Sequence, residues 1–345
     1  RISSNAPSSL YPLGAFGDVS LKDVTLNLEN KSAGTTQRLT TDEIQLSSPS
    51  LLQTAVNIDG KLNNALFSIK GDINLKSLRQ VPLDIKLILA KNQFNLEGTA
   101  FDPFYKPMYT GHVRTQISEL SDPFHTLGID VPDFIQKSKN LKNILFQGHI
   151  MVNDNEVAVR KMDLKMNVPN NGKNTKREVI KGRIFYNKSQ RQKPAHLDLK
   201  LEGQDLNLEQ LFSAIEQDEP KSQGWSDVPF DLSILGQFTF NARFKGQNIT
   251  YADNIYDRLT LQIMNTNSTL TLENLTVADA GGKAKLSGNY QHANSTPGLK
   301  AKIRFQKLPL NSLPANRISK TVSGKTTGMF DLTSRGISEK DLINH

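Results

Sequence analysis

Hydrophobic and polar residues alternate with a period of two along most of the chain. Residues 238–244 read Phe-Thr-Phe-Asn-Ala-Arg-Phe, and residues 299–305 read Leu-Lys-Ala-Lys-Ile-Arg-Phe. Successive side chains of a β-strand point to opposite faces, so each such segment predicts a strand with one apolar and one polar face. Turn-rich joints, such as Pro-Asn-Asn-Gly at 169–172, favour antiparallel hairpins and meanders over βαβ units.

The predicted fold class is therefore all-β with a few short helices. We expect an elongated, mainly antiparallel, twisted sheet that forms an open groove or an incomplete barrel. Short helices are predicted after Asn207, which is a suitable N-cap, and around Pro132, which is tolerated in a first helical turn.

A building block recurs along the chain. It consists of a strand containing glycine, a loop with proline, a second alternating strand and a polar segment with leucines, and its copies begin at 96–98, 180–182 and 286–288. A single hairpin unit cannot cover its own apolar face, so stacked copies are expected to share one continuous apolar surface.

The most linker-like segment is 216–224, Glu-Gln-Asp-Glu-Pro-Lys-Ser-Gln-Gly, which is charged and interrupted by proline. It predicts an N-terminal β-rich region at 1–215 and a C-terminal β region at 225–345. The chain begins at Arg1 rather than Met, and its last residues resemble the opening of another element. We therefore expect both ends to be truncations of a longer protein.

Composition narrows the choice of function. The 345 residues are 37% hydrophobic with a mean hydropathy of -0.44, which suits a sheet that is apolar on one face only. The net charge of +8 is spread over scattered Lys and Arg residues without interleaved aromatic residues, which predicts a solvated surface rather than a nucleic-acid platform. The absence of cysteine excludes disulfides and thiolate chemistry. No apolar run approaches the roughly 18 residues that span a bilayer.

Catalytic patterns are missing from the sequence. The six histidines are isolated, no Gly-x-Ser-x-Gly elbow occurs, and acidic pairs such as Asp154 and Glu156 are typical of a soluble surface. We therefore expect no catalytic residue, no metal and no cofactor, and we expect the protein not to be an enzyme.

Two segments carry a family resemblance. Residues 224–235, Gly-Trp-Ser-Asp-Val-Pro-Phe-Asp-Leu-Ser-Ile-Leu, resemble the Trp-Ser-x-x-Pro-Leu-Asp-Leu-Ser-x-Leu segment of AsmA-family proteins, with Phe230 in place of the usual leucine. Residues 336–343 are similar to the family's Gly-x-Ser-x-x-Asp-Leu-Leu pattern. The resemblance is clearest over 224–345 and looser before it, and the family's N-terminal membrane anchor is missing.

The resemblance implies a periplasmic protein of Gram-negative bacteria that is attached to the inner membrane through that N-terminal anchor. AsmA-like proteins, which include TamB- and YhdP-type proteins and are related to bridge-like lipid transfer proteins, have elongated β-structures with a hydrophobic groove. The implied function is phospholipid conduction toward the outer membrane, in support of outer-membrane homeostasis. Outer-membrane or other periplasmic proteins are further expected partners, and nucleic acid is not.

Three interpretations of the apolar strand positions stay open: a lipid-conducting groove, the filled core of a β-sandwich, and a non-catalytic scaffold in outer-membrane assembly that binds partners through exposed sheet edges. The candidate lipid-groove residues are Leu83, Ile85, Leu87, Ile144, Phe146, Leu164, Met166, Leu197, Leu199, Leu201, Phe238, Phe240, Phe244, Leu259, Leu261, Ile263, Leu270, Leu272, Leu286, Ile303 and Phe305.

Overall fold

The fold is taken from a computed structural model, in which the chain forms two compact units, Arg1–Asp154 and Asn155–His345. The structure describes residues 17–30, 35–50, 53–74, 77, 79–103, 105–119, 121–127, 131, 142–170, 173–188, 194–208, 226–228, 238–251, 254–266, 268–279, 281–291, 297–309 and 324–344. The predicted linker at 216–224 and the predicted helix around Pro132 lie outside the described residues.

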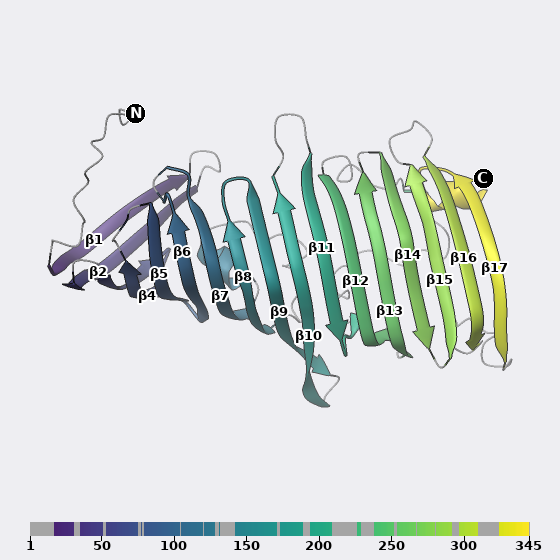
Figure 1. Ribbon diagram of the computed structural model, residues 1–345, viewed down its shortest axis with the longest axis horizontal. Coiled ribbons are helices and arrows are strands. Elements are labelled where there is room, and N and C mark those ends of the chain that lie inside the picture. Colours follow the sequence, from purple (N-terminus) through teal and green to yellow (C-terminus); the bar gives the residue numbers. More distant parts are fainter. Residues whose placement is uncertain are drawn as a thin grey trace. The chain divides into compact units, whose positions relative to one another are not determined.

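The first unit is an antiparallel meander in which each strand pairs with the next one along the chain (Figure 1). A short helix, α1 (Asp122–Thr126), belongs to the connection that joins the last two strands of this unit in the sequence. The strands are β1 (Val19–Asn30), β2 (Thr35–Ser50), β3 (Gln53–Leu62), β4 (Ala65–Asn74), β5 (Gln80–Leu89), β6 (Asn92–Phe101), β7 (Met108–Glu119) and β8 (Lys142–Val152).

The second unit is an antiparallel array of strands interrupted by one parallel pair. Its strands also pair in chain order, and every described pair is antiparallel except β11 with β12, which is parallel. A parallel pair needs a long crossover connection, and the chain supplies residues 205–237 between these two strands. The strands are β9 (Glu156–Asn170), β10 (Lys173–Asn187), β11 (Ala195–Gln204), β12 (Phe238–Tyr251), β13 (Asn254–Thr266), β14 (Thr269–Asp279), β15 (Gly282–Gln291), β16 (Gly298–Pro309) and β17 (Lys325–Arg335), and helix α4 (Glu339–Asn344) follows them.

The predicted all-β, mainly antiparallel and open fold is confirmed. Among the described residues, no hydrogen-bonded pair joins β1 to β8 or β9 to β17, so neither unit closes into a barrel. The repeated building block is confirmed as a hairpin, because its two strands are the antiparallel pairs β6–β7, β10–β11 and β15–β16.

Turn chemistry fixes the register of the tightest hairpin. Leu62 pairs with Ala65 across the β3–β4 turn, and the two residues between them, Asn63 and Asn64, have φ angles of 49° and 74°. Two consecutive positive φ angles are the geometry of a type I′ turn, which asparagine tolerates and which matches the twist of paired strands.

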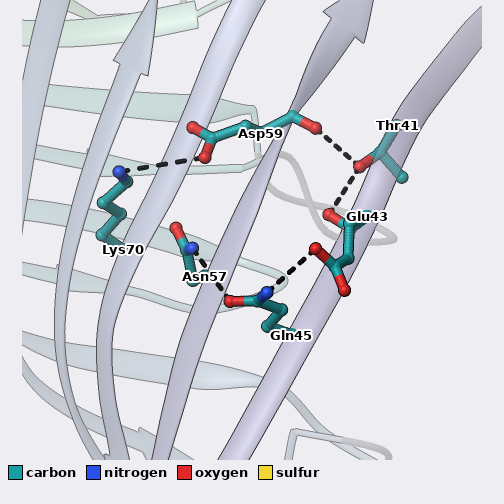
Figure 2. Close-up of polar contacts among 6 residues, drawn as sticks. All are labelled: Thr41, Glu43, Gln45, Asn57, Asp59 and Lys70. Atoms are coloured by element: carbon teal, nitrogen blue, oxygen red, sulfur yellow. Dashed lines mark hydrogen bonds and ion pairs between the residues drawn. The ribbon is translucent and has the colours of Figure 1, made fainter. Parts of the chain in front are cut away.

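A chain of polar side chains ties the first strands together laterally (Figure 2). The Gln45 amide of β2 donates to the Glu43 carboxylate at 2.9 Å and accepts from Asn57 of β3 at 3.4 Å. Asp59 of β3 forms an ion pair of 3.8 Å with Lys70 of β4. The buried hydroxyl of Thr41 donates a hydrogen bond of 2.6 Å to the Asp59 carbonyl oxygen. This bond satisfies a backbone acceptor beside a register shift in β2.

Candidate functional site, a continuous apolar face

Strand register places the candidate residues of the first unit on one face of its sheet. Residues directly opposite each other in neighbouring strands project to the same face, so the pairing extends face by face across the sheet. Leu83, Ile85 and Leu87 share a face with Phe146 and Ile144. One row of this face runs through Ile58, Ile69, Leu87, Phe94, Thr115 and Phe146.

The second unit has the same organisation, and every candidate residue in it lies on a single face. Leu164 and Met166 of β9 pair with Ile180 and Glu178 of β10, which continue into the same face. A central row runs through Leu201, Phe244, Leu261, Leu275, Leu286, Ile303 and Phe330, and a parallel row runs through Leu199, Ala242, Ile263, Leu272, Gly288, Ala301 and Leu332. We refer to this surface of each unit as its apolar face.

Bulges keep the apolar face continuous where the alternation slips. In β14, Gln262 pairs with Asn274 but Ile263 pairs with Leu272, so one extra residue lies in the strand. Because an inserted residue reverses the alternation, Leu272 and Leu275 both reach the apolar face despite a spacing of three. Strand β16 makes the same step from Phe305 to Leu308, where Lys307 has a φ of 48°.

The sequence prediction missed residues that lie beyond such slips, including Val159, Leu275 and Val277. Their pairing partners on the apolar face are Ile184, Leu261 and Leu259. A three-residue spacing between apolar positions inside an alternating segment is the signal that could have identified them.

The apolar face is only partly covered. Ile144 and Met166 are buried, Ile303 is 38% exposed, and the other candidate residues are intermediate. The inward residues of a packed sandwich are covered by a second sheet. The described strands form no second sheet against this face in either unit, so its leucines and phenylalanines shield one another but stay partly accessible.

Aromatic rings lie over glycines on the apolar face. The ring of Phe305 occupies the space beside Gly328, where an added Cβ would lie 2.7 Å from the ring. Phe244 lies in the same way beside Gly203 and Gly246, at 3.1 Å and 3.0 Å from the positions of added Cβ atoms. Because glycine has no side chain, the neighbouring ring can lie against the backbone at these positions.

Three tyrosines of the sheets, Tyr109, Tyr256 and Tyr290, have raised pKa values. Burial is the main cause of each raised pKa, because the phenolate is less well solvated there than in water. The charge of Glu97 adds to the rise at Tyr109, and the charge of Asp279 adds to it at Tyr256. The neutral phenol is therefore the stable form at these positions.

The two segments that carry the family resemblance are in contact. The Ser226 carbonyl oxygen accepts a hydrogen bond of 3.1 Å from the backbone of Lys340, whose ammonium group forms an ion pair of 2.9 Å with Asp227. Within the second segment, the Ser338 hydroxyl accepts from the Asp341 backbone at 3.2 Å, and the Asp341 carboxylate accepts from the Ile337 backbone at 3.2 Å. This reciprocal arrangement resembles a capping box at the start of α4.

A cross-strand row of charged and histidine side chains lies on the polar face of the first unit. The row consists of Asp72, Asp84, Glu97, His112 and His149, and together with neighbouring residues such as Leu83 it lines a hollow of ≈ 690 Å³. Despite this row, no group of three or more His, Asp or Glu side chains among the described residues could hold a metal ion. None of the helices among the described residues is long and apolar enough to cross a membrane.

No protein-family model, curated protein or solved structure matched the chain.

Proposed function

We propose that this chain is part of an AsmA-like periplasmic protein and that its apolar face binds phospholipid acyl chains and conducts them across successive strands toward the outer membrane. The observation that carries the proposal is the unbroken, partly exposed row from Leu201 through Leu261 to Ile303. The contact between the segments around Ser226 and Ser338 adds support, because both segments resemble sequence patterns of that family.

The dimensions of the sheet suit an acyl chain. One leaflet of a bilayer core is about 15 Å thick, and neighbouring strands lie about 4.8 Å apart, so an extended acyl chain covers about three strand intervals. Each methylene group removed from water contributes about 0.8 kcal/mol. A chain lying on the apolar face is therefore held by many small contacts, and each single step along the row exchanges only a few of them.

The experiment compares two aspartate substitutions at adjacent residues of β13. Leu261 lies on the apolar face between Phe244 and Leu275, whereas Thr260 lies on the polar face between Lys245 and Thr276. Leu261→Asp removes contact with about three methylene groups and places a charge that must stay hydrated against the acyl chain. The expected loss is at least about 2 kcal/mol, or roughly thirtyfold in affinity. Thr260→Asp is expected to leave lipid binding within twofold.

Binding is measured by native mass spectrometry of phospholipid that copurifies with the chain and by titration with a fluorescent phospholipid. Circular dichroism verifies that both variants keep the strand content of the parent chain. Recovery of no phospholipid with the parent chain, or equal losses from Leu261→Asp and Thr260→Asp, would refute the proposal.

A further inference from the structure

Basic side chains gather on the polar face of the second unit. Alternation along β12, β15 and β16 sends every second residue to this face, and many of those residues are Lys or Arg. We define the basic face as Arg243, Lys245, Arg258, Lys283, Lys285, Lys300, Lys302 and Arg304. Seven of these eight side chains are exposed, and Lys302 is partly exposed.

The centre of the basic face is a pair of like charges. Lys285 of β15 lies directly opposite Arg304 of β16, and the next residues of the same face along these strands are Lys283 and Lys302. Like charges placed opposite each other destabilise a sheet. Folding alone therefore gives no reason to collect four cations at this position.

Few acidic side chains offset this charge. Glu202 of β11 lies directly opposite Lys245 on the same face. On the polar face of β14 and β17 lie Glu273, which accepts a hydrogen bond from Gln262, and Asp331. Of the eight cations, only Lys302 forms an ion pair among the described residues, with Asp331 at 3.3 Å. The acidic residue nearest in sequence to Arg258 is Asp257.

The first unit contains a similar cation pair with the opposite surroundings. Lys70 of β4 lies directly opposite Lys86 of β5, and the next residues toward one end of the strands are Asp72 and Asp84, which also oppose each other. Lys70 additionally forms the ion pair with Asp59 at 3.8 Å. The net charge around this pair is balanced, whereas the charge around Lys285 and Arg304 is strongly positive.

We propose that the basic face is a docking surface for an anionic phospholipid bilayer. The cations extend from β12 to β16 over a width of about 20 Å, and clustered Lys and Arg side chains are attracted to acidic headgroups without any shaped pocket. On the described polar face of β14 to β16, which surrounds Lys285 and Arg304, there is no aromatic side chain on which a nucleic-acid base could stack. This composition disfavours a nucleic acid as the partner. The inference is independent of acyl-chain conduction, because it concerns the opposite side of the sheet.

The experiment measures cosedimentation of the full chain with sucrose-loaded vesicles. We expect binding to vesicles of about 70% phosphatidylcholine and 30% phosphatidylglycerol in about 50 mM NaCl, little binding to pure phosphatidylcholine, and loss of binding in about 500 mM NaCl. The double substitution Lys285→Gln with Arg304→Gln is expected to weaken binding about thirtyfold. The matched control, Lys70→Gln with Lys86→Gln, is expected to change binding less than twofold.

Three results would overturn the proposal. These are equal binding to neutral and anionic vesicles, equal losses in the two double variants, and displacement of the chain from vesicles by a charge-equivalent amount of single-stranded DNA. If the Lys285 and Arg304 variant loses strand content, Lys300→Gln with Lys302→Gln replaces it with the same expectation. Uptake of a fluorescent phospholipid by the same variants is expected to stay unchanged, so failure of bilayer docking and failure of acyl-chain binding are distinguishable.

Discussion

Gly182 is a residue at which a single added methyl group is expected to disturb the apolar face of the second unit strongly. It lies on β10 opposite Leu201 of β11, beside a register shift against β9, and its φ is 156°. A Cβ atom added there would lie 2.0 Å from the backbone oxygen of Lys200. Backbone atoms of a neighbouring strand cannot turn aside as a flexible side chain can, so Gly182→Ala must separate the strands or twist the bulge.

The size of the effect follows from this distance. Ordinary contact with a Cβ begins at 3.4 Å, so β10 and β11 would have to move apart by about 1.4 Å. A backbone hydrogen bond of about 2.9 Å is lost after such a displacement. Two lost ladder bonds cost about 1 kcal/mol each, and the unfavourable φ of alanine adds about another 1 kcal/mol. We expect Gly182→Ala to lower the free energy of unfolding by about 2 to 4 kcal/mol.

Urea denaturation followed by far-ultraviolet circular dichroism measures this change. With a dependence of about 3 kcal/mol per molar urea, the transition midpoint should fall by about 1 M. The control is Gly298→Ala in β16, because an added Cβ there meets nothing within 4 Å. The control should stabilise the chain by up to about 1 kcal/mol. A midpoint for Gly182→Ala within about 0.2 M of the parent chain (about 0.6 kcal/mol at that slope), or an equal fall for Gly298→Ala, would show that the close approach does not limit this site.

Further predictions concern single residues of the two units. Phe305→Ala should lower the free energy of unfolding by about 1 to 2 kcal/mol in thermal unfolding, because the ring of Phe305 covers Gly328. The side chain of Phe330 is 63% exposed, so Phe330→Ala should lower it by less than about 1 kcal/mol. A larger loss for Phe330→Ala than for Phe305→Ala would contradict this packing. Ser20→Ala should raise the lowered pKa of Glu43 toward its ordinary value in a carboxyl NMR titration, and by more than Lys22→Gln does, because the Ser20 hydroxyl is the main cause of the lowered pKa. The raised pKa of Tyr290 contributes stability that is present below the ordinary pKa of 10.0 and is lost as the pH rises through the raised value. Tyr290→Phe should therefore reduce the loss of stability above pH 10.0, measured by urea titrations at a series of pH values. An unchanged dependence of the free energy of unfolding on pH would contradict this.

Local sequence predicted the strands well, because apolar and polar residues alternate with a period of two in a strand that is covered on one side. The segments around Ile85, Phe240 and Ile303 became strands with the expected inward and outward residues. Local sequence did not predict the parallel pairing of β11 with β12, since both strands have the same alternation in either direction. That choice depends on the long connection between them.

The candidate site was predicted in composition but not in extent. Alternation identified residues such as Leu261 and Leu286 as apolar-face residues, yet it could not show that they lie in one row separated only by Leu275. The bulge before Leu275 interrupts the period on which the prediction depended, and only the pairing with β13 shows that the row continues. Acyl-chain binding at these residues stays a prediction.

By itself, the sequence determined that the chain forms strands with one apolar and one polar side, because each side chain's face follows from its position in an extended backbone. The tertiary structure alone decided that these sides join into continuous surfaces and that the apolar one stays partly exposed. It also decided that basic residues scattered along the sequence, from Arg243 to Arg304, meet on one face. The physical reason is that register between strands is set by turns, bulges and pairing over long sequence separations, which no local period encodes.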